Sequence, residues 1–194
     1  AVFVVPQCSN RTKGWGGMAS DVKRLLDYVV QQEAADTTRI YIFGGSMGGT
    51  GTWKMLSLYP CYFAAAMPCA GNPKGMSAEN VATTPVYTVM GLADKIMGSD
   101  VRTTLETFIT QLESLGDEVR YETVAGWTHE MTCIQSYSAV RLGWVFSHKR
   151  GQTTDLTISP INATDEGWYD LSGRRFAAPL SHGVYIHKGK KVVF

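Results

Sequence analysis

The chain has 194 residues, 44% of them hydrophobic and 18% charged, and its formal net charge is +1 at pH 7. This length fits one domain, or one domain with a small appendage, and the apolar fraction is sufficient for a buried core. The near-neutral charge gives no electrostatic reason to expect a nucleic-acid partner, and no apolar run approaches the ~18 residues that a membrane-spanning helix needs.

Short apolar runs alternate with amphipathic helical patterns before residue 150. In residues 20–36 the apolar side chains recur at the spacing of one helical face. Such alternation is typical of βαβ units, so we predict an α/β fold: a largely parallel sheet of about five strands with helices on both faces. The strands are predicted at 1–6, 39–43, 63–68, 86–90 and 118–124, and the helices at about 20–36, 53–59, 100–115 and 131–146.

The pattern changes from about Gly151, where helical periodicity stops. Ser172-Gly173 lies between two strand-like runs and Gly189 between two more, which indicates hairpins. We therefore predict two domains, an α/β core at 1–150 and a small β tail at 151–194. Two basic clusters are expected to be solvated surface: His148-Lys149-Arg150, and Lys188, Lys190 and Lys191.

The four cysteines, Cys8, Cys61, Cys69 and Cys133, do not have the spacing of a zinc site. They could form two disulfides with three possible connectivities, or remain free thiols that pack as small apolar groups. The chain has no initiator Met, and its start has no basic segment followed by a long apolar run. We therefore expect no secretory signal, and we expect a processed form or a fragment.

Residues 44–48 read GGSMG, directly after a predicted strand and before a predicted helix. This is the G-x-S-x-G pattern, in which a serine occupies a sharp turn and small neighbours avoid clashes with the strand and the helix. Ser46 is therefore the candidate nucleophile. The backbone N–H of the next residue, Met47, is the candidate donor to an oxyanion.

A serine hydroxyl needs a base to take its proton, and the base needs a carboxylate to orient it. Among His129, His148, His182 and His187, only His129 follows a predicted strand, where the active site of a parallel sheet lies. Asp94 follows the strand at 86–90. Asp100 is the weaker candidate because it lies at a predicted helix start, where the helix dipole explains an acidic residue.

The stretches PQC, DTTRIYIFGGSMGGTGTW, YPCYFAAAMPCAG, VMGLAD and GWTH resemble the α/β-hydrolase superfamily. The resemblance covers residues 1 to about 148. It is strongest to the bacterial esterase branch that includes polyhydroxybutyrate-depolymerase-like, feruloyl-esterase-like and phospholipase/carboxylesterase-like enzymes. It implies hydrolysis of carboxylic esters through an acyl-enzyme, without a metal or other cofactor, on small-molecule or polymer-attached substrates.

In that resemblance Ser46 is the nucleophile, His129 the base and then the acid, and Asp94 its orienter. The family also has strands, and a second oxyanion loop often containing His-Gly, before the position of residue 1, and the chain lacks these. Gln7 is the candidate for a substitute oxyanion donor. Trp127 and Asn72, in loops after predicted strands, are candidates for contact with the substrate.

The tail resembles C-terminal β modules of secreted bacterial proteins, some of which are sorting signals. It favours a secreted, periplasmic or cell-surface enzyme, although it could also be a plain β extension of the core. Two alternatives to the esterase remain open. One is a serine peptidase of the prolyl-oligopeptidase type, and the other is a non-catalytic remnant. The sequence does not indicate an oligomeric state.

Overall fold

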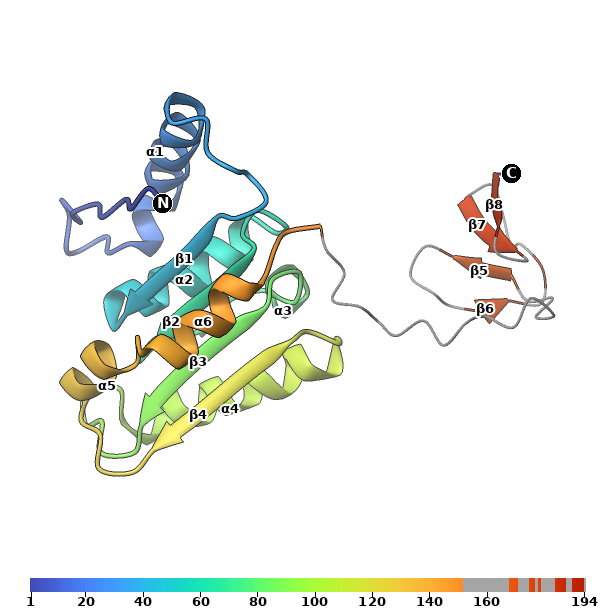
Figure 1. The fold of residues 1–194 in the computed structure, drawn as a ribbon. Helices are drawn as coiled ribbons and strands as arrows, with labels where there is room; N and C mark the ends of the chain where they lie inside the picture. Colours follow the sequence, from blue (N-terminus) through green and yellow to red (C-terminus); the bar gives the residue numbers. More distant parts are fainter. Residues whose placement is uncertain (152–167, 171–174, 177, 179–183, 188–189, 194) are drawn as a thin grey trace. The chain divides into compact units, whose positions relative to one another are not determined.

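The structure is a computed structural model, and it describes residues 1–151, 168–170, 175–176, 178, 184–187 and 190–193 (Figure 1). The chain divides into two units, Ala1–Gln152 and Thr153–Phe194. The triad candidates Ser46, Asp94 and His129 all belong to the first unit.

A sheet of four parallel strands forms the centre of the first unit. Its strands follow one another in chain order: β1 (Tyr41–Gly45), β2 (Ala65–Cys69), β3 (Val86–Gly91) and β4 (Val119–Val124). Every residue of β2 and β3 is buried, whereas the edge strands β1 and β4 are half-exposed. Because the strands are parallel, the loops that follow them meet at one edge of the sheet.

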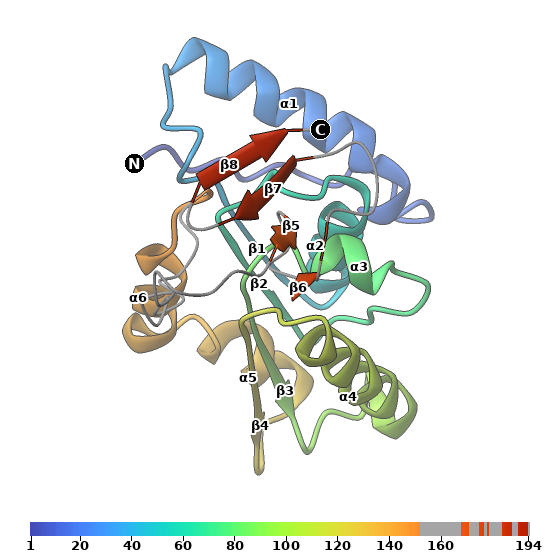
Figure 2. The same ribbon diagram turned by 90° about the vertical axis from the view of Figure 1, so that its right-hand side faces the viewer.

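Helices cover both faces of this sheet. Figure 2 shows α4 on one side of β3 and β4, with α5 and α6 on the other. The predicted fold class, a parallel sheet with helices on both faces, is confirmed. The helices are α1 (Ala19–Gln32), α2 (Met47–Leu58), α3 (Ala78–Val81), α4 (Gly98–Ser114), α5 (His129–Gln135) and α6 (Ala139–Ser147), with a 3-10 turn at Gly16–Met18.

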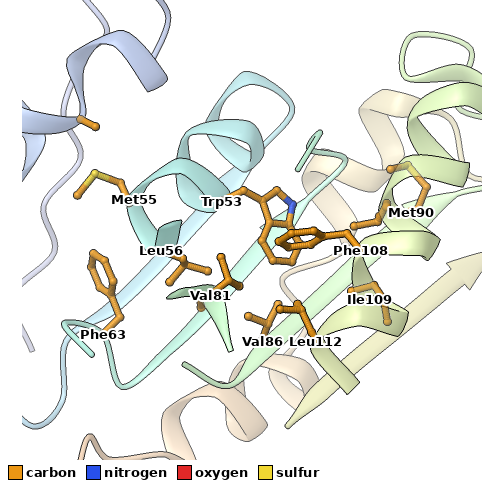
Figure 3. Packing of buried hydrophobic residues seen from close by; sticks show 13 residues of the cluster. Trp53, Met55, Leu56, Phe63, Val81, Val86, Met90, Phe108, Ile109 and Leu112 are labelled. Atoms are coloured by element: carbon orange, nitrogen blue, oxygen red, sulfur yellow. The ribbon is translucent and has the colours of Figure 1, made fainter. Parts of the chain in front are cut away.

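The larger core cluster surrounds Trp53 of α2, which is fully buried (Figure 3). Its indole ring meets the ring of Phe108 from α4 edge to face, with the ring centroids 5.5 Å apart. Val86 and Met90 reach this cluster from β3, whereas Val89 belongs to a second cluster on the α6 side. Successive side chains of β3 therefore point to opposite faces of the sheet, so this one strand packs against the helices on both faces.

The prediction of a strand at residues 1–6, and with it a five-stranded sheet, is wrong for this structure. Residues 1–6 have no regular secondary structure, and Val2, Phe3 and Val5 are 54%, 79% and 89% exposed. Apolar β-branched residues become a strand only where a neighbouring strand satisfies their backbone N–H and C=O groups. In the described part of the chain, no strand pairs with these residues.

The single helix predicted at 131–146 is two helices, which meet at residues 136–138. The Ser136 hydroxyl donates to the carbonyl of Thr132, and the Ser138 hydroxyl accepts from the N–H of Arg141 at 3.5 Å, as an N-cap does. Serine favours such caps because its hydroxyl bonds nearby backbone groups. The first of the two helices begins at His129, earlier than predicted.

His148 is a further correction, because it is buried and not part of a solvated cluster. Only 8% of it is exposed, and its Nδ1 lies 2.8 Å from the carbonyl oxygen of Trp144. Its Nε2 lies 3.3 Å from a carboxylate oxygen of Glu118. A buried imidazole with two partners is a packing element between α6 and the start of β4.

The second unit contains an antiparallel sheet in the order β6-β5-β7-β8. Strands β5 and β6 pair, as do β7 and β8, which matches the two predicted hairpins. The predicted turns at Ser172-Gly173 and Gly189 themselves lie outside the described residues. The strands are β5 (Trp168–Asp170), β6 (Arg175–Phe176), β7 (Val184–His187) and β8 (Lys190–Val193).

Candidate active site

Ser46 is the single residue between β1 and α2, and its backbone is in the left-handed region, with φ 56° and ψ −119°. Such a conformation costs a non-glycine residue about 1–3 kcal/mol and persists only where its surroundings fix it. Here the Ser46 N–H donates to the carbonyl of Cys69 at 3.1 Å. A Cβ atom on Gly44 would lie 2.2 Å from the Gly48 carbonyl oxygen, so the turn requires glycine at position 44.

Three side chains from three different loops form a continuous hydrogen-bonded chain. The Ser46 Oγ lies 2.8 Å from His129 Nε2, and His129 Nδ1 lies 2.7 Å from Asp94 Oδ2. The other carboxylate oxygen, Oδ1, accepts the N–H groups of Ile96 and Met97, both at 2.9 Å. The Asp94 side chain is 1% exposed and that of His129 is 19% exposed. With Nδ1 protonated, Nε2 is free to accept the serine proton.

The loops that carry Asp94 and His129 are hydrogen-bonded to each other. The N–H of Ala93 donates to the carbonyl of Trp127 at 3.0 Å. A Cβ atom on Gly91 would lie 2.3 Å from that same carbonyl oxygen, so glycine at the end of β3 allows this approach. The two loops therefore hold the carboxylate and the imidazole at a fixed separation.

Met47 is the first residue of α2, so its N–H has no carbonyl acceptor within the helix. Its side chain is 40% exposed. Gln7 is also exposed, in the irregular segment at the N-terminus, and among the described residues it has no hydrogen bond to the triad. Met47 directly follows Ser46 in the chain, and the oxyanion roles of Met47 and Gln7 stay predictions.

Trp127 and Asn72 lie in the loops after β4 and β2, and both are half-buried. The guanidinium of Arg141 lies over the Trp127 ring, 5.4 Å from its centroid. The side-chain oxygen of Asn72 accepts the N–H of Lys74 at 2.9 Å, and its own N–H donates to Thr50 Oγ1 at 3.0 Å. In the described residues neither side chain is hydrogen-bonded to the triad.

Cys133 is a neighbour of the triad that the sequence reasoning missed. Its Sγ lies 3.9 Å from His129 Nε2, one helical turn further along α5. Burial and the nearby Asp94 carboxylate raise the pKa of this thiol, so it stays protonated at neutral pH. The i, i+4 spacing from His129 would have predicted this contact only if the predicted helix had started at residue 129.

The remaining candidates lie elsewhere. Asp100 is in the first turn of α4, and His187 is in the second unit, while His182 lies outside the described residues. All four cysteines are free thiols. Within the described ranges, no cluster of three or more His, Cys, Asp or Glu side chains is arranged to hold a metal ion. No helix in that same part of the chain is long and apolar enough to cross a membrane.

Comparison with known proteins gives similarities to hydrolases. Residues 9–77, which include Ser46, match the prolyl oligopeptidase family. Acetylxylan esterase A of Emericella nidulans is 36% identical over 67 residues, which are 34% of this chain and 22% of that protein. Acetylxylan esterase A of Aspergillus awamori is 23% identical over 188 residues, 92% of this chain and 60% of that protein.

The crystal structure of a thermostable esterase superposes on 68% of this chain and 36% of its own, with a TM-score of 0.61 and 26% sequence identity. The chain spans 22% and 60% of the two curated relatives above. Together with the parallel sheet and its serine turn, these similarities give the chain the α/β-hydrolase fold, with a sequence similar to those of esterases.

Proposed function

We propose that the chain hydrolyses carboxylic esters, with Ser46 as nucleophile, His129 as general base and acid, and Asp94 as the carboxylate that orients the imidazole. The hydrogen-bonded chain from Ser46 Oγ through His129 to Asp94, with distances of 2.8 and 2.7 Å, is the observation that supports this most directly. Each of the three residues follows a different strand at the same edge of the sheet.

In the proposed reaction the Ser46 hydroxyl attacks the ester carbonyl carbon while its proton passes to His129 Nε2. The negative charge that develops on the carbonyl oxygen is stabilised by the N–H of Met47 at the start of α2. His129 then gives the proton to the departing alcohol, leaving an acyl group on Ser46. A water molecule, deprotonated by His129, releases the carboxylic acid and restores the serine.

The proposed substrate class is taken from relatives such as the two acetylxylan esterases above. We propose small acyl esters attached to a plant polysaccharide or to its fragments, with Trp127 and Asn72 contributing to the rim of the site. We also propose that the protein is exported. The tail resembles sorting modules, and a polymer substrate is too large to enter a cell.

The test compares hydrolysis of p-nitrophenyl acetate by the wild type and by Ser46→Ala. We expect turnover in the wild type and a loss of at least about 10³-fold in Ser46→Ala, because the acyl-enzyme cannot form. Release of acetate from acetylated xylan would support the polymer substrate. Equal turnover in both proteins, or none in the wild type, would contradict the proposal and favour a non-catalytic role.

Asp94→Asn tests the orienting role, with Asp100→Asn as the matched control. The amide favours the wrong imidazole tautomer, so we expect kcat to fall by about 10³–10⁴-fold with little loss of stability. Asp100 lies in the first turn of α4 and is exposed, so its amide variant should keep kcat within about twofold. Similar losses in the two variants would argue against Asp94.

A peptidase is the second candidate, because residues 9–77 match the prolyl oligopeptidase family. The two activities are separated by comparing p-nitrophenyl acetate with an aminoacyl p-nitroanilide at equal concentration. Faster cleavage of the ester is expected. Faster cleavage of the anilide would replace the esterase proposal with the peptidase.

A further inference from the structure

Arg141 of α6 connects the segments on either side of His129. Its guanidinium lies over the Trp127 ring, 5.4 Å from the ring centroid. Its Nε and Nη2 donate to Glu122 Oε2 of β4 at 3.0 and 2.6 Å. Its Nη1 donates to the carbonyls of Gln135 and Ser136 at 3.3 and 3.4 Å.

These partners lie just before and at the end of the helix that carries the imidazole. Trp127 lies just before α5, which begins at His129, and Gln135 and Ser136 are its last residue and its C-cap. One guanidinium thus contacts the polypeptide before and after the short helix. We refer to Arg141, Trp127, Glu122 and the Ser136 carbonyl as the arginine clamp.

The clamp is anchored in the sheet by Glu122. The carboxylate of Glu122 also accepts a hydrogen bond from the hydroxyl of Tyr87 on β3, so two strands hold its position. The Arg141 side chain is 15% exposed and that of Glu122 is 39% exposed. Partial burial raises the pKa of Glu122, but the hydrogen bonds from Arg141 and Tyr87 outweigh this and lower it below its usual value.

A guanidinium suits this place better than an ammonium would. It is planar, so it can stack on the indole of Trp127, and its fork of N–H groups reaches several acceptors in one plane. The Trp127 carbonyl in turn accepts the N–H of Ala93, next to Asp94. Displacement of Trp127 would therefore disturb both ends of the His129–Asp94 hydrogen bond.

We propose that Arg141 is a positioning residue for the triad: through the arginine clamp it fixes α5, and with it the His129 ring, relative to Ser46 and Asp94. This inference rests on the proposed function of those three residues. A hydrogen bond of 2.8 Å between His129 and Ser46 tolerates little movement, and a shift of about 1 Å in a catalytic group can lower the rate about 100-fold.

The test uses two arginines that each lie over a tryptophan. Arg141→Met keeps an unbranched side chain but removes the guanidinium, and with it the stacking on Trp127 and all the hydrogen bonds of the clamp. Arg120→Met is the matched control. Arg120 lies on β4, and its guanidinium is 5.1 Å from the ring centroid of Trp144. Among the described residues it has no contact with α5. With p-nitrophenyl acetate we expect Arg141→Met to lose about 10- to 100-fold in kcat with KM within about twofold, and Arg120→Met to stay near wild type.

A second readout does not depend on turnover. We expect the proton of His129 Nδ1, held between the ring and Asp94, to give a low-field NMR signal in the wild type. This signal should shift or vanish in Arg141→Met and persist in Arg120→Met. Arg141→Lys keeps the positive charge but not the fork of N–H groups, so its kcat should lie between that of Arg141→Met and that of the wild type. If Arg141→Met does not fold, Glu122→Gln replaces it, with an expected loss of about 3- to 10-fold in kcat.

The outcomes separate the two proposals. An unchanged kcat and an unchanged low-field signal in a folded Arg141→Met protein would overturn the positioning role, as would equal losses in Arg120→Met. If the wild type shows no ester turnover, the proposed function fails, and the low-field signal alone then decides whether the clamp positions His129.

Discussion

Ser46 keeps its left-handed backbone through contacts made by its neighbours. Its N–H is bonded to the Cys69 carbonyl of the adjacent strand, and Gly44 lies so close to the first turn of α2 that a side chain there would overlap the Gly48 carbonyl. Gly48 itself has open space around the position of a Cβ atom. The two glycines of one motif therefore have different physical roles.

We predict that Gly44→Ala destabilises the first unit by about 2–3 kcal/mol and lowers kcat, because the new methyl group forces the backbone apart. Gly48→Ala should be neutral or stabilising by up to about 1 kcal/mol, since alanine is favoured over glycine inside a helix. Urea unfolding followed by tryptophan fluorescence checks both. An equal loss of stability in the two variants would show that the close contact at residue 44 is not what requires glycine.

Asp117, between α4 and β4, has a partly buried carboxyl group whose Oδ2 has no hydrogen-bond partner. Burial, together with the neighbouring Glu118 charge, raises the pKa of Asp117 to about 7, although a backbone hydrogen bond at Glu118 acts in the opposite direction. The folded state therefore binds a proton more tightly than the unfolded state, where the carboxyl has its ordinary pKa near 3.8. Stability is then lost as the pH rises from about 4 to about 7.

Asp117→Asn should remove this pH dependence, because the amide stays neutral. At pH 8 we expect the variant to be more stable than the wild type by about 1–2 kcal/mol, less than the full shift would give because water reaches part of the carboxyl. The free energy of unfolding at pH 5 and pH 8 is the measurement. Glu113→Gln, at an exposed position on α4, is the control. A stability of Asp117→Asn that still falls over this range would rule out Asp117 as the source.

At the scale of elements, α5 is the helix that carries the candidate base, His129. It is only seven residues long, begins at His129 and is capped by Thr128, whose Oγ1 accepts the N–H of Met131 at 3.4 Å. So short a helix has little stability of its own. Its orientation therefore depends on its contacts: packing against β1 and β3, the cap at one end and Arg141 at the other.

Thr128→Ala should weaken the start of α5 by about 1 kcal/mol and lower kcat about 3- to 5-fold, because His129 occupies the first turn. Thr128→Ser keeps the capping oxygen and should stay near wild type. Steady-state kinetics of the two variants, with circular dichroism to show that both are folded, makes the comparison. A loss of activity in Thr128→Ser equal to that in Thr128→Ala would point to the methyl group and not to the cap.

At the scale of the whole molecule, the structure assigns the triad, the arginine clamp and both core clusters to the first unit. The four-stranded parallel sheet supplies all the loops that meet at the triad, and none of the described contacts of that site comes from residues after 152.

We therefore predict that a chain ending at Gln152 folds and keeps the kcat of the full chain within about threefold, since no triad contact is removed. Turnover of p-nitrophenyl acetate and the thermal unfolding midpoint of the two chains are the measurements. An insoluble or inactive short chain would mean that residues after 152 are needed for the fold of the first unit.

The candidate site could largely be proposed from the sequence because its signals are local. The glycines around Ser46 and the ends of the strands before Asp94 and His129 are short-range patterns, and the parallel sheet follows from their alternation with helices. The strand expected at residues 1–6 and the single helix at 131–146 were wrong for another reason. A strand depends on a pairing partner and a helix break on capping contacts, which a periodic pattern does not contain.

By itself, the sequence determined the fold class and the order in which serine, carboxylate and imidazole follow three different strands. Only the tertiary structure showed that Arg141 contacts Trp127 and pairs with Glu122, that Cys133 lies against the imidazole, and that Asp117 is half-buried. The physical reason is distance along the chain. Hydrophobic periodicity reports on neighbours within a turn or two, whereas a cation over a ring, or a carboxyl shielded from water, depends on segments that meet only in the folded protein.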